Sequence, residues 1–185
     1  MISVDQIFNN QYYKKSNWIY LLIPISIFFY FSSILRKYLY KNGFLKTIKI
    51  KVPVLIIGNI TLGGTGKTPL ALDLIENFLN KGLKPALISR GYGGSANNIT
   101  EVFEFSNVRA VGDEALLIKA KAKSKIPVFI GKDRVDVAKI LLKKYPETSI
   151  IISDDGLQNY RLARDYEIIV VDSQRQFGNG LIFPA

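Results

Sequence analysis

The sequence contains no cysteine and no histidine among its 185 residues. Without cysteine, disulfide bonds and thiol chemistry are excluded, and without histidine the chain lacks the commonest general base of enzymes. Acidic residues are also absent between Gln6 and Leu72, so every formal charge in that stretch is positive. The net charge of +10 is therefore concentrated in the N-terminal part. Because the remainder is close to neutral, the composition does not indicate a nucleic-acid-binding surface, and we expect no nucleic-acid partner.

An uncharged run, Trp18–Leu35, lies within this basic part. As a helix with a rise of 1.5 Å per residue it would extend about 27 Å, slightly less than the ~30 Å hydrocarbon core of a bilayer. Aromatic residues at both ends and basic residues after it are typical of contact with anionic lipid. We therefore predict a membrane-associated helix within residues 1–50, kinked at Pro24 and either spanning or half-inserted. A cleaved signal peptide and a buried core helix are the alternatives.

A glycine-rich stretch, Thr61–Thr68, follows an apolar run, Val52–Gly58, that is typical of a buried parallel strand. Apolar residues at helical spacing come next, and this order of strand, glycine-rich turn, Gly-Lys-Thr and helix predicts a P-loop. In a P-loop, backbone N–H groups surround nucleotide phosphates, Lys67 would contact the β- and γ-phosphates, and Thr68 would hold Mg²⁺. The usual motif has Gly where this chain has Thr61, so a chance glycine-rich turn is the alternative. The predicted phosphate-binding residues are Thr61, Leu62, Gly63, Gly64, Thr65, Gly66, Lys67 and Thr68.

Short apolar runs alternate with helical patterns in the rest of the chain, which predicts a doubly wound α/β fold. We expect a P-loop NTPase-like parallel sheet with helices on both faces over residues 51–185. A polar excursion interrupts it with a short strand at Val102–Phe105, and Asp133 is expected to cap a helix. The further predicted strands are Pro85–Ser89, Ile126–Gly131, Ser149–Ser153 and Glu167–Val171.

Charged residues follow these strands at the edge where parallel sheets place their ligand sites. Asp154 and Asp155 follow an apolar strand, where a P-loop enzyme needs a carboxylate for Mg²⁺, although an Asp-Gly turn is the alternative. Asp113 and Glu114 form a second acidic pair that could orient a hydroxyl and accept its proton, or could simply cap a helix. The basic candidates for neutralising transferred charge, or alternatively surface residues, are Arg90 and Arg134.

Six motifs of this sequence occur in the order typical of the tetraacyldisaccharide 4'-kinase (LpxK) family of lipid A biosynthesis, which the chain resembles throughout. In that family the P-loop carries Thr in the first glycine position, as this chain does at Thr61. The motifs are Gly58–Pro69, Ser89–Gly94, Val111–Glu114, Gly131–Arg134, Ser153–Gln158 and Phe177–Gly180.

The resemblance implies a lipid kinase that uses ATP and Mg²⁺ at the cytoplasmic face of the bacterial inner membrane. The γ-phosphate of ATP would pass to the 4'-hydroxyl of the tetraacyldisaccharide 1-phosphate precursor of lipid A, forming lipid IVA. The resemblance also assigns roles to residues. Asp113 would be the base, with Lys67, Asp154 and Asp155 as further catalytic groups. The implied metal ligands are Thr68, Glu114 and Asp155, and the residues implied to line the nucleotide site are Arg90, Tyr92, Arg134 and Gln158.

Two departures from the family pattern affect the expected activity. Members usually carry His where this chain has Asn159, and they continue into a second lobe that supplies a supporting His. We therefore expect this chain to be a fragment or a truncated product without that lobe. A non-catalytic remnant that still binds nucleotide and a membrane-bound P-loop switch ATPase are the alternative functions. The sequence does not indicate the oligomeric state or the preferred acyl chains.

Overall fold

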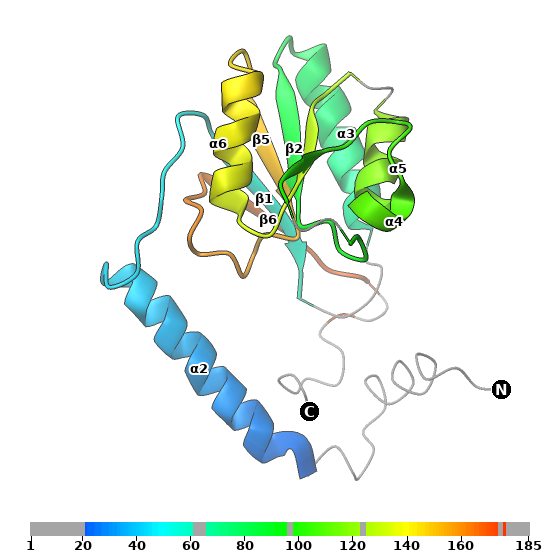
Figure 1. Cartoon of the computed structure of the whole chain (residues 1–185). Coiled ribbons are helices and arrows are strands. Elements are labelled where there is room, and N and C mark those ends of the chain that lie inside the picture. Colours follow the sequence, from blue (N-terminus) through cyan, green and yellow to red (C-terminus); the bar gives the residue numbers. More distant parts are fainter. Residues whose placement is uncertain (1–20, 61–65, 96–97, 123–124, 174–175, 177–185) are drawn as a thin grey trace, which may run out of the picture. The chain divides into compact units, whose positions relative to one another are not determined.

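The computed structural model describes residues 21–60, 66–95, 98–122, 125–173 and 176 (Figure 1). It divides into two units. One comprises residues 46–59 and 64–170 and contains the sheet, and the other comprises residues 1–45, 60–63 and 171–185 and contains helix α2. The predicted phosphate-binding residues Thr61–Thr65 and the motif Phe177–Gly180 lie outside the described residues.

The sheet has six strands in the described part of the chain, in the order β3-β4-β2-β5-β1-β6. Five of them pair in parallel, which confirms the predicted parallel sheet, and β3 pairs antiparallel with β4. The strands are β1 (Val54–Asn59), β2 (Pro85–Ser89), β3 (Thr100–Glu101), β4 (Val128–Ile130), β5 (Ile150–Asp154) and β6 (Tyr166–Val170). The helices of this unit are α3 (Lys67–Asn80), α4 (Val108–Val111), α5 (Asp113–Lys121) and α6 (Arg134–Lys144).

Helices cover both faces of the sheet, as predicted, because each central strand is apolar on both sides. Leu55 and Ile57 of β1 pack with α3 and α5 in one cluster of buried residues. Val54 and Ile56 of the same strand pack with α6 in the other cluster. Figure 1 shows α6 on one side of the sheet and α3 and α5 on the opposite side.

The predicted strand at Val102–Phe105 is wrong, because the strand in this region is Thr100–Glu101 and the chain turns directly after Val102. The hydroxyl of Ser106 accepts a hydrogen bond from the Phe103 N–H at 2.9 Å, and the Ser106 N–H donates to the Phe103 carbonyl at 3.0 Å. These two bonds use the backbone groups that a continuing strand would need. The apolar residues of this segment alone did not indicate that the Ser106 hydroxyl competes for the Phe103 backbone.

Helix ends follow the local signals of the sequence. Asp133 caps α6, accepting hydrogen bonds from the N–H groups of Val135 at 2.9 Å and Asp136 at 3.3 Å, and its carboxylate also pairs with Arg161. Gly82, with φ of +75°, ends α3, where an L-residue would be strained. Both assignments agree with the sequence prediction.

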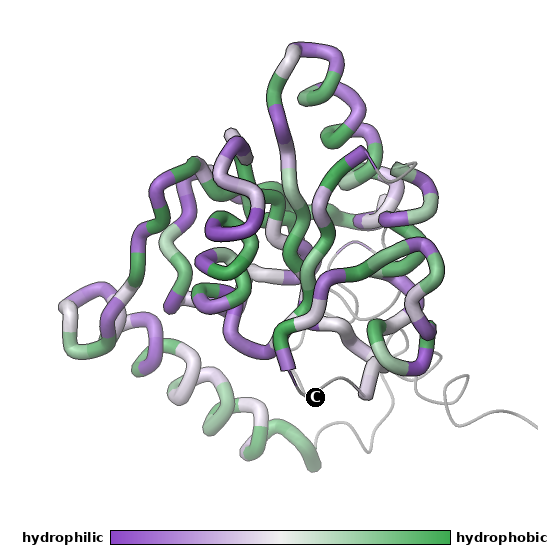
Figure 2. Tube along the Cα trace, turned by 45° about the horizontal axis from the view of Figure 1, so that its top comes forward, coloured by the Kyte–Doolittle hydropathy of each residue, from purple (hydrophilic) through white to green (hydrophobic). Residues whose placement is uncertain are grey.

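Helix α2 (Ile23–Lys41) belongs to the other unit and is apolar over most of its length (Figure 2). The predicted run began at Trp18, outside the described residues, and the helix continues beyond Leu35. Pro24 lies in the first turn of α2, where its missing N–H costs no helical hydrogen bond, and the residues before 21, on which the predicted kink depends, lie outside the described residues. No helix in the described part of the chain has the length and apolar character needed to cross a bilayer. The large apolar side chains of α2 that are 45–73% exposed are Ile25, Ile27, Phe28, Phe29, Tyr30, Phe31, Ile34, Leu35 and Tyr38.

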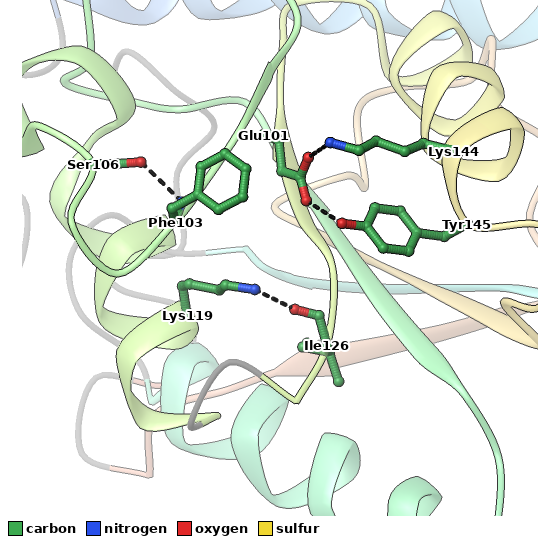
Figure 3. Close-up of polar contacts among 7 residues, drawn as sticks. All are labelled: Glu101, Phe103, Ser106, Lys119, Ile126, Lys144 and Tyr145. Atoms are coloured by element: carbon green, nitrogen blue, oxygen red, sulfur yellow. Dashed lines mark hydrogen bonds and ion pairs between the residues drawn. The ribbon is translucent and has the colours of Figure 1, made fainter.

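A buried carboxylate fastens the edge strand β3 to the end of α6 (Figure 3). Glu101 accepts a hydrogen bond from the Tyr145 hydroxyl at 2.5 Å and forms an ion pair with Lys144. The bond to Glu101 is the main cause that raises the pKa of Tyr145 to about 12. Nearby, the buried Lys119 donates to the Ile126 carbonyl at 2.8 Å. These contacts hold the antiparallel edge of the sheet in place. The residues that make them are distant in sequence from the P-loop.

We expect Glu101→Gln to lower the free energy of unfolding by about 1–3 kcal/mol, because the amide replaces a charged acceptor with a weaker one that also presents donors to Lys144. Urea unfolding measures this change. Glu76→Gln, on the exposed side of α3, is the matched control and should shift the urea midpoint little. Equal shifts for the two variants would contradict a structural role for Glu101.

Candidate nucleotide site

The ammonium group of Lys67 lies between two oxygen atoms at the carboxyl end of the sheet. Its Nζ atom is 2.7 Å from Oδ1 of Asn59 and 3.5 Å from Oδ1 of Asp155. Lys67 begins α3 immediately after Gly66, whose φ of +85° turns the chain into the helix, and Asn59 is the last residue of β1. Sequence analysis placed Lys67 and Asp155 together but missed Asn59. Its position at the carboxyl end of the strand before the P-loop is the signal that could have found it.

Asp154 is the last residue of β5 and only 2% exposed. Its Oδ1 atom has no hydrogen-bond partner among the described residues. The pKa of its carboxyl is raised from 3.8 to about 6, mainly by burial and then by the negative charge of Glu114, against the opposing charge of Lys67. The parallel pairing of Asp154 with Ile57 of β1 places this carboxylate beside the P-loop strand. The structure therefore brings together Asp154, Asp155, Glu114 and Lys67, as the sequence predicted.

Arg134 is 3% exposed, so the alternative that it is a surface residue is wrong. Its guanidinium donates to the carbonyl of Gly131 at 2.9 Å and to the carbonyl of Asp154 at 3.1 Å. Burial lowers its pKa to about 10, against the raising effect of the Asp154 and Asp155 charges, so it stays protonated at neutral pH. Arg134 thus holds the main chain that carries both aspartates. Its Nε atom and Oγ of Ser153 are also buried without a partner in the described residues.

These residues fit a magnesium ion that also binds phosphate. Asp154 offers a buried carboxylate oxygen without a partner, and Glu114 and Asp155 add negative charge nearby. Mg²⁺ prefers such oxygen ligands and commonly takes only one or two carboxylates from the protein, the rest coming from phosphates and water. Within the described residues, no group of three or more His, Cys, Asp or Glu side chains could by itself hold a metal ion.

Asp113 and Glu114 open α5 and are both exposed. The Asp113 carboxylate accepts a hydrogen bond from the N–H of Glu114 at 2.9 Å and remains accessible. Both acidic residues lie in the first turn, but the N-cap of α5 is Gly112 and no side chain caps the helix. Gly112, just before them, packs so closely on the loop after β2 that an added Cβ would lie 2.5 Å from the Tyr92 carbonyl oxygen. The motifs Ser89–Gly94 and Val111–Glu114 are therefore held together by direct backbone contact.

The remaining predicted site residues have different outcomes. Thr68 is the second residue of α3, beside Lys67. Arg90 lies near enough to Arg134 that its charge helps to lower the pKa of Arg134. The side chains of Tyr92 and Gln158 are exposed, and their nucleotide contacts stay predictions.

Residues 18–185 match the model of the family described as tetraacyldisaccharide-1-P 4'-kinase, LpxK. The chain belongs to this family. It is 43% identical to the tetraacyldisaccharide 4'-kinase of Methylobacillus flagellatus over 175 residues, which cover 95% of this chain and 52% of that protein. It is also 43% identical to the enzyme of the same name from Shewanella halifaxensis over 177 residues, covering 96% of this chain and 53% of that protein.

A solved structure of LpxK from Aquifex aeolicus in complex with ATP has the same fold. It matches with a TM-score of 0.72 and 32% identity, over 80% of this chain and 47% of that one. The chain therefore spans about half the length of the relatives it matches. The P-loop fold and the LpxK resemblance read from the sequence are thereby confirmed.

The raised pKa of Asp154 predicts how the stability of this LpxK family member depends on pH. Because the pKa is higher in the folded chain than in the unfolded chain, the folded state binds more protons between about pH 4 and pH 6. The free energy of unfolding therefore falls as the pH rises through this window. Asp154→Asn removes the free-energy cost of keeping a buried carboxylate ionised. We expect it to be more stable than the parent at pH 7.5 by on the order of 2–3 kcal/mol.

The advantage of Asp154→Asn should shrink toward pH 4, where the carboxyl of the parent is protonated. Urea unfolding at both pH values, without nucleotide or metal, measures it. Asp73→Asn, at an exposed position of α3, is the matched control. An equal difference between Asp154→Asn and the parent at both pH values would show that burial does not perturb this carboxyl.

Proposed function

We propose that this protein is the ATP-dependent kinase, or the nucleotide-binding half of the kinase, that phosphorylates the 4'-hydroxyl of the tetraacyldisaccharide 1-phosphate precursor of lipid A. The product would be lipid IVA. The observation that carries the proposal is the placement of the Lys67 ammonium at the start of α3, between Asn59 and Asp155. Membership of the LpxK family and the ATP in the Aquifex aeolicus structure support the choice of phosphate donor.

Lys67 would supply positive charge to the β- and γ-phosphate oxygens. In the structure its ammonium occupies a position between two oxygen acceptors, so incoming phosphate oxygens would replace or join these partners. The N-terminus of α3 adds partial positive charge at the same point. Both effects stabilise the charge that spreads over the transferred group, and they need no reorganisation when the reaction occurs.

Magnesium would be held by Thr68, Glu114 and Asp155, with Asp154 beside them. When bound, the ion would neutralise phosphate charge and align the γ-phosphate. The buried Arg134 keeps the Asp154 main chain in place through the Asp154 carbonyl. The carboxylates would therefore be ordered before the nucleotide arrives.

Asp113 would orient the 4'-hydroxyl and accept its proton as the new oxygen–phosphorus bond forms and the bond to the β-phosphate oxygen breaks. It is exposed at the start of α5, where an acceptor could reach it. Since the sequence contains no histidine, no imidazole of this chain can assist it. The same absence makes a non-catalytic nucleotide-binding chain the second candidate function.

Helix α2 would place the protein on the cytoplasmic face of the inner membrane, next to its lipid substrate. Exposed apolar side chains extend along this helix, and the chain has positive and no negative formal charges from Gln6 to Leu72. Burial of apolar surface in the acyl region and attraction of basic residues to anionic headgroups would act together.

Lys67→Ala should weaken ATP binding about tenfold or more, because it removes the charge that faces the phosphates. Asp113→Ala should leave ATP affinity within about twofold, because a base acts in the chemical step. Titration with a fluorescent ATP analogue measures both, and Asp73→Ala is the matched control. A folded parent chain that binds no nucleotide would overturn the proposed function.

Lipid phosphorylation by the same preparations tests the chemical role. We expect a very low rate for the parent chain, on account of the missing histidine. Any measurable kcat should fall on the order of 10²-fold or more in both Lys67→Ala and Asp113→Ala. Robust phosphorylation by Asp113→Ala would assign the base to another group.

Deletion of residues 1–45 should release the protein from membranes of expressing cells. A finer test is the double variant Phe28→Lys and Phe31→Lys, which places charge among exposed apolar side chains of α2. Ser33→Lys, at an exposed position of the same helix, is the control for added charge. Release of the parent by high salt alone would show that the contact is electrostatic, without apolar insertion.

A further inference from the structure

Asp155 lies in a backbone conformation that needs support from elsewhere in the fold. Its φ of +52° is in the left-handed region, which is unfavourable for an aspartate compared with glycine. It begins a short segment, residues 155–160, which we call the Asp155 turn. The turn must keep this conformation for the Asp155 carboxylate to remain 3.5 Å from the Lys67 ammonium.

The first half of the turn is fixed by packing on the sheet. The Leu157 side chain lies directly over Gly58 of β1, so closely that an added Cβ on Gly58 would be 2.4 Å from Leu157 Cγ. Gly156 is equally confined, because an added Cβ there would lie 2.8 Å from the Ser153 hydroxyl. The Asn159 N–H then donates to the Gly156 carbonyl at 2.9 Å and closes the turn.

The second half of the turn is held by one side chain. Arg164 donates to the Leu157 carbonyl at 3.0 Å and to the Asn159 carbonyl at 2.8 Å. Its guanidinium also lies 5.4 Å from the centre of the Tyr160 ring and forms an ion pair with Glu167 of β6. Arg164 is thus anchored at the edge strand while it holds two carbonyls of the turn.

We propose that Arg164 is a positioning residue for the nucleotide site, which sets the Asp155 carboxylate for magnesium by clamping the carbonyls of Leu157 and Asn159. The inference rests on the proposed function, because it takes Asp155 as a magnesium ligand. Within the part of the chain that the structure describes, Arg164 contacts the turn and Glu167 and does not contact Lys67, so we place its effect in the turn. A guanidinium can serve both carbonyls with separate N–H groups in a planar fork, whereas an ammonium has no such geometry.

The test compares Arg164→Ala and Arg164→Lys with Glu167→Gln, in the full 185-residue chain. Arg164→Ala and Arg164→Lys both remove the clamp, and Arg164→Lys keeps the positive charge next to Glu167. Glu167→Gln removes the ion pair with β6 and keeps the clamp. The probe is a fluorescent ATP analogue, titrated with and without Mg²⁺ for each variant.

We expect the Mg²⁺ concentration for half-maximal binding to rise about tenfold or more in Arg164→Ala, by analogy with other residues that orient metal ligands. Arg164→Lys should show most of that rise, and Glu167→Gln less than about a twofold change. Metal-free affinity for the analogue should stay within about twofold in all three, because Lys67 is untouched. A rise in Glu167→Gln equal to that in Arg164→Ala, or no rise in Arg164→Ala, would overturn the proposal.

Hydrogen exchange of residues 155–160 gives a readout that does not depend on nucleotide. Exchange should be faster in Arg164→Ala and Arg164→Lys than in the parent and in Glu167→Gln. If the parent binds no nucleotide, the proposed function fails, and this measurement still decides whether Arg164 clamps the turn. Unchanged exchange in both Arg164 variants would overturn the clamp, and faster exchange with an unchanged Mg²⁺ requirement would show a role in folding alone.

Discussion

The parallel pairing of β5 with β1 is the constraint on which the rest of the site depends. Ile57 of β1 lies opposite Asp154 of β5, and each strand ends within two residues of that pair. Both strands therefore end at the same edge of the sheet. Lys67 begins the helix that comes after β1, and Asp155 directly follows β5, so this register favours the contact between two residues that are 88 positions apart in sequence.

Burial of charge is the cost of this arrangement. Asp154 and Arg134 are almost inaccessible to water, and both pKa values are shifted toward the neutral form, chiefly by that burial. A buried carboxylate with a raised pKa destabilises the empty chain and leaves an oxygen ready for a cation. The proposed magnesium site would benefit from such an oxygen, because a ligand without other partners is free to coordinate a cation.

Much of the fold could be predicted because its signals are local. The five parallel strands were found from short apolar runs, and the ends of α3 and α6 from Gly82 and Asp133. The strand predicted at Val102–Phe105 was wrong because the Ser106 hydroxyl competes for the Phe103 backbone. There a single neighbouring hydroxyl decided the outcome, and the apolar residues of the segment did not indicate it.

The sequence by itself determined the P-loop, the order of strands and helices and the acidic residues at strand ends, because each is encoded within about ten neighbouring residues. Only the tertiary structure decided that Arg134 is buried, that Asn59 contacts Lys67 and that Arg164 holds the Asp155 turn. These facts depend on which strands become neighbours. The insertion of β5 between β1 and β2 is a long-range packing choice, and no local pattern of residue types records it.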